Sequence, residues 1–246
     1  MAEKLTYFIS DLHLGARYIA DPKAHERKLC DWLRSIAPTA CRIYLVGDII
    51  DYWYEYRNVA PQGYVRFLGT LADLADSGIE ITWLIGNHDI WMFGYLQREL
   101  GIRVIDGVLE EAIEGKRFVI THGDGIGKLP FAERFMRAVF RNKILQTLFA
   151  AVHPRWTVGL AYSWSSSNRK RGAARNVYSH EPAIDWVKNR NYALPENQRP
   201  DFYVFGHYHN AFSDRVEGSQ VTILADCITS VNYAVFDGNV LSSHSL

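Results

Sequence analysis

The chain has 246 residues, of which 48% are hydrophobic and 22% are charged, a composition typical of a soluble globular protein with a sizeable core. Its 27 Lys and Arg residues balance its 27 Asp and Glu residues, so no overall positive charge indicates a nucleic-acid partner. No uninterrupted apolar stretch is long enough to span a bilayer, and the first apolar run ends at Asp11, too early for the core of a signal peptide.

Strand patterns and helix patterns alternate along the first half of the chain. Short runs rich in β-branched and aromatic residues predict strands at 4–10, 41–47, 80–86, 116–123, 201–207, 221–226 and 230–236. Helical patterns at 25–36 and 64–78 separate the first three strands, and the closely spaced strands after Gln220 are expected to form a meander. Because such alternation builds crossover units, we expect an α/β fold with two mixed sheets packed face to face and helices outside.

The segment 128–175 departs from this alternation and is interpreted as a helical insertion within one domain, 1–246. Phe131 and Phe135 are four residues apart, as are Ile144 and Leu148, which predicts amphipathic helices. Its basic residues are Arg134, Arg137, Arg141, Lys143, Arg155, Arg169, Lys170, Arg171 and Arg175. Such helices suit a lid over an anionic, apolar ligand or a surface lying on anionic lipid. The alternative is a helical hairpin with its apolar face on the core and a solvated basic side.

Polar side chains follow five of the predicted strands, at the point where each strand ends. In chain order they are Asp11 and His13, Asp48 and Asp51, Asn87 with His88 and Asp89, His122, and the pair His207 and His209. Carboxyl ends of strands in α/β folds usually hold ligands, and residues two apart on an extended segment point to the same side.

The residue types at these strand ends favour a site for metal ions. Oxygen and imidazole donors without a thiolate suit Mn²⁺, Fe or Zn²⁺. The set is too large for one ion, which favours the two-metal arrangement of phosphatases and nucleases. Each residue also has a structural interpretation: Asp11 and Asp48 could cap helices, the histidines could bond within loops, and Asn87 could serve a turn. Because five strands end alike, we favour the functional interpretation for the set.

Five motifs in this order resemble the motif set of the calcineurin-like metallophosphoesterases. They are "DLH", "GDIID", "GNHD", "THGD" and "GHYH", and they extend from residue 11 to residue 209. The resemblance implies a four-layer α-β-β-α sandwich of two mixed sheets and two divalent metal ions, Mn²⁺ being favoured over Fe or Zn²⁺. The implied ligands are Asp11, His13, Asp48 and His209 for one ion and Asp48, Asn87, His122 and His207 for the other, with Asp48 bridging.

The resemblance also implies two catalytic residues and several substrate contacts. His88 would face the substrate, where it would stabilise phosphoryl charge or protonate the leaving oxygen, and Asp51 would orient it. Asn87 and His207 would lie close enough to touch the substrate as well. Asp89 is expected to be structural, and Asp124 fits either a functional site or an Asp-Gly turn.

Within the family the chain most resembles the branch that hydrolyses UDP-2,3-diacylglucosamine in lipid A synthesis, giving UMP and 2,3-diacylglucosamine 1-phosphate. The resemblance rests on chain length, on "GDIIDYW", and on the basic, apolar segment after "HGD". In that branch the matching insertion is a helical lid that holds acyl chains, and it implies head-group contacts by Asn168, Arg169, Lys170 and Arg171. One departure is clear: the branch usually has Arg at the position of His88, and often Glu at that of Asp51.

Three functions are compatible with these sequence features. The leading hypothesis is a metal-dependent pyrophosphatase acting on a nucleotide-linked glycolipid at the inner face of the cytoplasmic membrane. The second is a soluble phosphodiesterase or nucleotidase, and the third a membrane-binding scaffold with an inactive metal site. Three scattered cysteines, Cys30, Cys41 and Cys227, favour a reduced, cytoplasmic setting. We expect no nucleic-acid partner; the sequence leaves the native metal, the acyl-chain length and the oligomeric state open.

Overall fold

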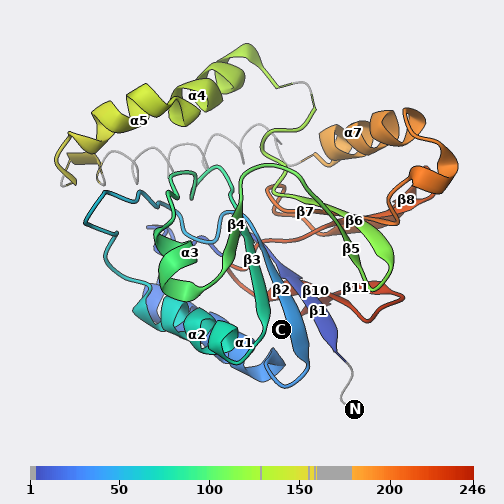
Figure 1. Ribbon diagram of the computed structural model, residues 1–246, viewed down its shortest axis with the longest axis horizontal. Helices are drawn as coiled ribbons and strands as arrows, with labels where there is room; N and C mark the ends of the chain where they lie inside the picture. The colour runs from blue at the N-terminus through green and yellow to red at the C-terminus, as the bar shows by residue number, and fades with distance from the viewer. Residues whose placement is uncertain (1–3, 128, 155, 158, 160–178) are drawn as a thin grey trace.

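The computed structural model describes residues 4–127, 129–154, 156–157, 159 and 179–246 (Figure 1). Two mixed sheets form its centre. The strands of the first sheet, in the order β11-β10-β1-β2-β3-β4, are β11 (Leu241–Ser245), β10 (Asn232–Phe236), β1 (Leu5–Ile9), β2 (Ala40–Val46), β3 (Glu80–Leu84) and β4 (Arg103–Ile105). The strands of the second, in the order β5-β6-β7-β9-β8, are β5 (Leu109–Ile113), β6 (Lys116–Thr121), β7 (Phe202–Phe205), β9 (Ser219–Ile223) and β8 (Phe212–Val216).

Parallel pairing places the functional loops. β1, β2, β3 and β4 run parallel to one another in the first sheet, and β6, β7 and β9 do so in the second. Each of β1, β2, β3, β6 and β7 is followed by one of the five motifs. Because the strands of a parallel set end at the same edge, the motif loops of each sheet lie together.

Helices cover the outer face of each sheet, which confirms the four-layer sandwich. The first sheet is covered by α1 (Pro22–Ile36), α2 (Val65–Asp76) and α3 (Tyr95–Leu100), whose apolar residues share one core with that sheet. The second is covered by α7 (Glu181–Tyr192), which buries Ala183 and Val187 against β7 and β9 and precedes the short 3₁₀ helix η1 (Glu196–Gln198).

Local signals explain where the first two helices begin. Asp21 accepts hydrogen bonds from the backbone N–H groups of Lys23 and Ala24 at 3.0 and 2.8 Å, and so caps α1. The first turn of α2 is capped from another helix, because buried Glu26 of α1 accepts from the N–H groups of Arg66 and Phe67. This carboxylate therefore ties the two helices together.

The two sheets are joined by an aromatic core. Phe8 stacks on Tyr44, with ring centroids 4.9 Å apart, and on Phe118 of the opposite sheet at 5.7 Å. All three rings are buried. Burial of a side chain of this size contributes about 1.5–3 kcal/mol, so this layer fixes the sheets against each other and with them the loops at their edges.

Two helices lie within the predicted insertion: α4 (Phe131–Arg141) and α5 (Lys143–Ala150). In Figure 1 they lie on one side of the molecule, beyond the loops that follow β2 and β3. The predicted contacts Asn168, Arg169, Lys170 and Arg171 lie outside the described residues. No described helix combines the length and the apolar character that crossing a bilayer requires.

Candidate functional site

The side chains predicted to form the site come from loops of both sheets and lie together where the parallel strands end. Their ligand atoms form three groups, each with all atoms within 4.8 Å of one another: Asp11 with His13 and His209, Asp48 with His122 and His207, and Asp51 with His13 and His88. Residues distant in sequence are thus neighbours in space. The first two groups contain six of the seven implied ligands and divide the histidines as the motifs imply, with Asp48 in the second group.

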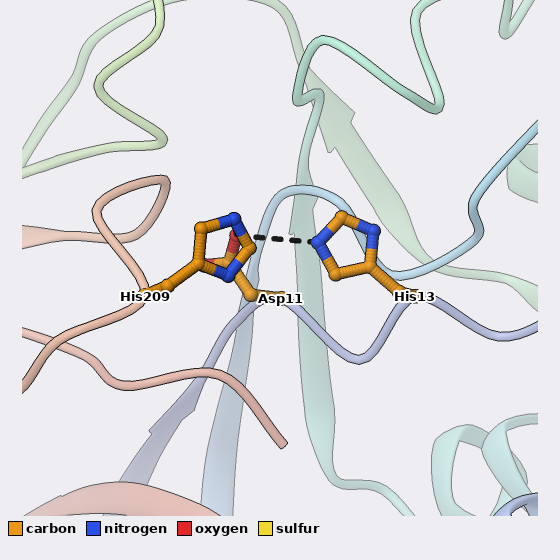
Figure 2. Close-up of side chains that lie close together, drawn as sticks. All are labelled: Asp11, His13 and His209. Atoms are coloured by element: carbon orange, nitrogen blue, oxygen red, sulfur yellow. Dashed lines mark ion pairs between the residues drawn. The ribbon is translucent and has the colours of Figure 1, made fainter. Parts of the chain in front are cut away.

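The first group surrounds one oxygen of a wholly buried aspartate. Oδ1 of Asp11 lies 3.7 Å from Nε2 of His13 and 3.8 Å from Nε2 of His209. Figure 2 shows the Asp11 carboxylate next to the His209 ring, with an ion pair to the His13 ring drawn as a dashed line. The centroids of the two rings are 5.2 Å apart. The other oxygen, Oδ2, accepts hydrogen bonds from the Ser10 hydroxyl and the His207 backbone N–H. The carboxylate is therefore held with one oxygen facing the two imidazoles.

The second group is built around Asp48. Its Oδ2 lies 3.4 Å from Nε2 of His122, while its Oδ1 accepts from the backbone N–H of His88 at 2.9 Å. Nε2 of His122 also lies 3.3 Å from Oδ1 of Asn87, and the His122 and His207 rings are 5.2 Å apart. The loops after β2, β3, β6 and β7 thus contribute one side chain each.

The third group links a residue of the first group to His88. Oδ1 of Asp51 lies 3.3 Å from Nδ1 of His13 and 3.2 Å from Nδ1 of His88. The Nδ1–H of His88 can also donate to the backbone carbonyl of Asp51, at 3.1 Å. Nε2 of His88 faces the opposite way and lies 3.8 Å from Oδ2 of Asp48. His88 is thus oriented from behind, as the motifs imply.

Four histidines share one orientation, with Nδ1 next to an oxygen and Nε2 turned to the site. His13 and His88 use Asp51, His122 uses the carbonyl of Val46 at 2.9 Å, and His209 lies 3.3 Å from Asp226. Metal-binding histidines characteristically give their other ring nitrogen such a partner, which fixes the tautomer and the ring orientation.

The backbone at these residues adopts an uncommon conformation. Five of the seven proposed ligands have left-handed φ angles between 45° and 72°: Asp11, His13, Asp48, His207 and His209. Such angles cost energy for residues other than glycine and gather at functional sites. The fold therefore maintains strain where these side chains converge.

Glycines let the loops approach closely. A Cβ at Gly86 would overlap Oδ1 of Asp48, and one at Gly206 would overlap the Ser10 hydroxyl. At Gly47, whose φ is +83°, a Cβ would lie 2.5 Å from Nδ1 of His122. The glycines of "GD", "GN" and "GH" are thus needed for contact between neighbouring motifs.

The charges of the site are strongly coupled. Burial raises the pKa of Asp11, but His209 and His13 outweigh it and hold that pKa well below its usual range. Burial lowers the pKa of His122, but Asp48 outweighs it and raises that pKa to about 9. Burial and the neighbouring His122 lower the pKa of His207 to about 3. The ionised carboxylates therefore attract positive charge into the site.

Two buried atoms provide a test of whether a cation fits. Oδ1 of Asp11 and Nε2 of His13 are buried, and neither has a hydrogen-bond partner within the part of the chain that the structure describes. Leaving such atoms unsatisfied costs about 1–3 kcal/mol each. Both are suitable ligand atoms, and they converge from two loop positions. The residues present therefore fit a divalent cation.

Other residues of the motifs have supporting positions. Asp89 is wholly buried and accepts from the N–H groups of Ile49 and Gly86 and from the Trp83 indole, so the structural prediction for it is confirmed. Asp124 forms an ion pair with Arg137 of α4. Sequence reasoning missed Asp226, although it follows a predicted strand just as the other site residues do.

Comparison with known proteins identifies the family. A model described as calcineurin-like phosphoesterase matches residues 5–211. The chain belongs to this family. Proteins named UDP-2,3-diacylglucosamine hydrolase are similar to it: that of Porphyromonas gingivalis is 41% identical, covering 98% of this chain and 97% of the relative. That of Ralstonia nicotianae is 28% identical, covering 89% and 82%, and that of Serratia proteamaculans is 24% identical, covering 93% and 98%.

Family membership and the side-chain groups together indicate a metal-dependent hydrolase of phosphoesters. The family implies divalent metal ions, and the oxygen and imidazole donors of the calcineurin-like site are of the type that such ions prefer.

Proposed function

We propose that this protein hydrolyses the pyrophosphate bond of UDP-2,3-diacylglucosamine, releasing UMP and 2,3-diacylglucosamine 1-phosphate. One observation carries the proposal: a complete set of seven candidate ligands, with His88 poised beside them, occurs in a chain 41% identical to a UDP-2,3-diacylglucosamine hydrolase over almost its full length.

The proposal includes two divalent ions, with Mn²⁺ favoured and Fe or Zn²⁺ as alternatives. One would be held by Asp11, His13 and His209, the other by Asn87, His122 and His207, and Asp48 would contribute to both. In such sites the ions make a water molecule nucleophilic near neutral pH and offset the charge of the phosphoryl group. The buried carboxylates and the oriented imidazoles supply the oxygen and nitrogen ligands that Mn²⁺ accepts.

In this proposal His88 acts on the oxygen of the leaving group. As water adds to one phosphorus, the bond between that phosphorus and the bridging oxygen breaks, and this oxygen gains a proton or a hydrogen bond from Nε2 of His88. Asp51 holds the other ring nitrogen, so that Nε2 points to the reacting group. A positioned acid of this kind contributes about 10²–10⁴-fold to the rate. Asn87 and His207 both lie next to His122, and in this proposal both would contact the phosphoryl group.

The side chains of α4 and α5 are the evidence for a lipid-linked substrate and for contact with an anionic membrane surface. Phe131 and Ile144 are 80% and 72% exposed, so their apolar side chains have little cover. Arg134, Arg137 and Arg141 lie on α4 beside these apolar groups and line one depression with Phe131 and Phe135. Apolar and basic groups together fit acyl chains, phosphates and anionic lipid. The head-group contacts Asn168, Arg169, Lys170 and Arg171 belong to this proposal.

The test is direct hydrolysis. Purified protein is incubated with UDP-2,3-diacylglucosamine and, in turn, Mn²⁺, Fe²⁺, Zn²⁺ and Mg²⁺, and UMP is measured. We expect release with at least one metal and none with the Asp48→Asn variant. UDP-N-acetylglucosamine, which lacks the two long acyl chains, serves as the second substrate. Absence of UMP with every metal, or equal turnover of both substrates, would reject the lipid assignment.

A further inference from the structure

The loops that carry the catalytic residues continue into an aromatic pair. Tyr54 follows Asp51 by three residues, and Trp91 follows His88 by three. Tyr54 and Trp91 form an isolated parallel bridge, and the backbone N–H of Glu55 donates to the carbonyl of Trp91 at 3.0 Å. The two loops are therefore joined to each other beyond the catalytic residues.

A buried carboxylate strengthens this unit. Glu55, only 6% exposed, accepts hydrogen bonds from the backbone N–H groups of Phe93 and Tyr95 and from the indole of Trp53. Three hydrogen bonds thus converge on this one side chain. The segments 53–55 and 91–95 are therefore held to each other by contacts that do not involve the insertion.

Tyr54 and Trp91 donate hydrogen bonds to the segment 140–146, which includes the end of α4 and the first half of α5 and is called the α4–α5 junction. The Tyr54 hydroxyl donates to the carbonyl of Gln146 at 2.6 Å, and the Trp91 indole N–H donates to the carbonyl of Phe140 at 2.9 Å. Phe140 lies in the last turn of α4, where carbonyl groups lack a partner within the helix. The Phe140 carbonyl also accepts from the side-chain amide of Gln146 at 2.8 Å, so Trp91 adds a second donor from the catalytic loop to a contact between α4 and α5.

Ring packing accompanies the two hydrogen bonds. Trp91 stacks on Phe149 of α5, with centroids 5.3 Å apart and planes at 27°, and meets Phe140 edge-on at 5.5 Å. Tyr54 also contacts Phe149, at 5.1 Å. Edge-on and offset-stacked arrangements are the favourable geometries for aromatic pairs. Both helices are thus attached to the same two side chains.

We propose that Tyr54 and Trp91 are positioning residues that clamp the α4–α5 junction to the loops carrying Asp51 and His88, and so determine preference for a substrate with an apolar portion. Only the identity of the substrate in this inference rests on the proposed function; the contacts of the clamp do not. An apolar group bound against α4 and α5 would be held at a fixed distance from His88, and loss of fixed geometry costs reaction rate. A small phosphodiester does not reach these helices and would gain little from the clamp.

Two hydrogen-bond variants test the clamp. Tyr54→Phe removes the hydroxyl and keeps the ring, and Trp91→Phe removes the indole N–H and keeps an aromatic side chain. Tyr192→Phe is the matched control, because its exposed hydroxyl donates to Glu217 on the second sheet, away from the insertion. For the double variant we expect kcat/KM for UDP-2,3-diacylglucosamine to fall at least tenfold more than kcat/KM for bis(p-nitrophenyl) phosphate, mainly through kcat, because the bound substrate is no longer held at a fixed distance from His88. The control should leave the ratio of the two within twofold.

A measurement without substrate separates the clamp from the proposed function. Trypsin cleavage after Arg141 and Lys143, at the α4–α5 junction, is followed by mass spectrometry. We expect cleavage there to be at least fivefold faster in the double variant than in the wild type and in Tyr192→Phe. Equal cleavage rates, or equal losses of kcat/KM for both substrates, would overturn the inference. Faster cleavage in a protein whose wild type releases no UMP would support the clamp and reject the lipid substrate.

Discussion

Oδ1 of Asp51 lies 3.2 Å from Nδ1 of His88, and the same oxygen lies 3.3 Å from Nδ1 of His13. One carboxylate thus orients both the proposed acid and a proposed metal ligand. His13 in turn faces Asp11 through its Nε2. The Asp51 carboxylate therefore connects the proposed acid to the proposed metal ligand His13.

Replacement of Asp51 by Asn should impair both roles of this carboxylate. An amide oxygen carries no negative charge, so its hydrogen bonds to the two imidazoles are weaker than those of the carboxylate. We expect kcat for a small phosphodiester at saturating Mn²⁺ to fall about 10–100-fold, the range for loss of a group that orients a metal ligand. Asp31→Asn, at an exposed ion pair with Arg34, is the control. A kcat within twofold of the wild type would show that Asp51 does not orient His88.

Asp226 should influence metal affinity through His209. Its Oδ2 lies 3.3 Å from Nδ1 of His209, whose other nitrogen faces Asp11. In Asp226→Asn the ring loses a charged partner, and we expect the Kd for Mn²⁺, measured by competition with a chelator, to rise about 10–100-fold. The exposed Asp214→Asn should leave the Kd unchanged. If both variants bind Mn²⁺ like the wild type, Asp226 has no positioning role.

Two glycines offer a test of close packing. A Cβ at Gly86 would overlap the Asp48 carboxylate, whereas Gly69 in α2 has no neighbouring atom within 4 Å of such a Cβ. Gly86→Ala should lower the free energy of unfolding by about 1–3 kcal/mol because an overpacked site must shift. It should also reduce bound metal. Gly69→Ala should raise that free energy by about 0.5–1 kcal/mol. Urea denaturation measures both, and similar effects of the two variants would argue against the packing explanation.

Metal removal should destabilise the protein. A cation that binds only the folded chain stabilises it by about 2.7 kcal/mol at a free concentration of about 100 times its Kd. For a chain of this size we expect Tm to rise about 5–10 °C between EDTA and saturating Mn²⁺. Asp11→Asn, which removes charge from the first group, should lose most of this rise. An equal Tm with and without Mn²⁺ would contradict metal binding by the folded state.

The sequence predicted the functional part of the fold better than its periphery. The strands that carry site residues are buried, apolar runs, and all seven predicted strands are present. Six of them agree with the prediction within two residues at either end, and β9 ends three residues earlier than predicted. β8 and β11 were missed because they lie at sheet edges with mostly exposed side chains, so "FSDRV" and "LSSHS" have no apolar signature. α7 was missed because its sequence has only a weak apolar stripe.

The site residues likewise include some that the sequence pattern identifies and others that only tertiary packing brings into contact. Residues at strand ends could be found from the pattern, since each follows a recognisable run. Contacts between distant side chains could not be read from spacing: the position of Asp226 behind His209 depends on β9 lying beside β7. The hydrogen bonds from Tyr54 and Trp91 to the α4–α5 junction likewise depend on tertiary packing, because their partners are backbone carbonyls that any residue could offer.

We propose that seven side chains hold two cations with Asp48 between them. Anomalous scattering from crystals soaked in Mn²⁺ would locate these ions. We expect two peaks about 3.5–4 Å apart, one beside Asp11, His13 and His209 and the other beside Asn87, His122 and His207, with the Asp48 carboxylate touching both. A map with no peak in this site, or with a single ion that Asp48 does not contact, would contradict it.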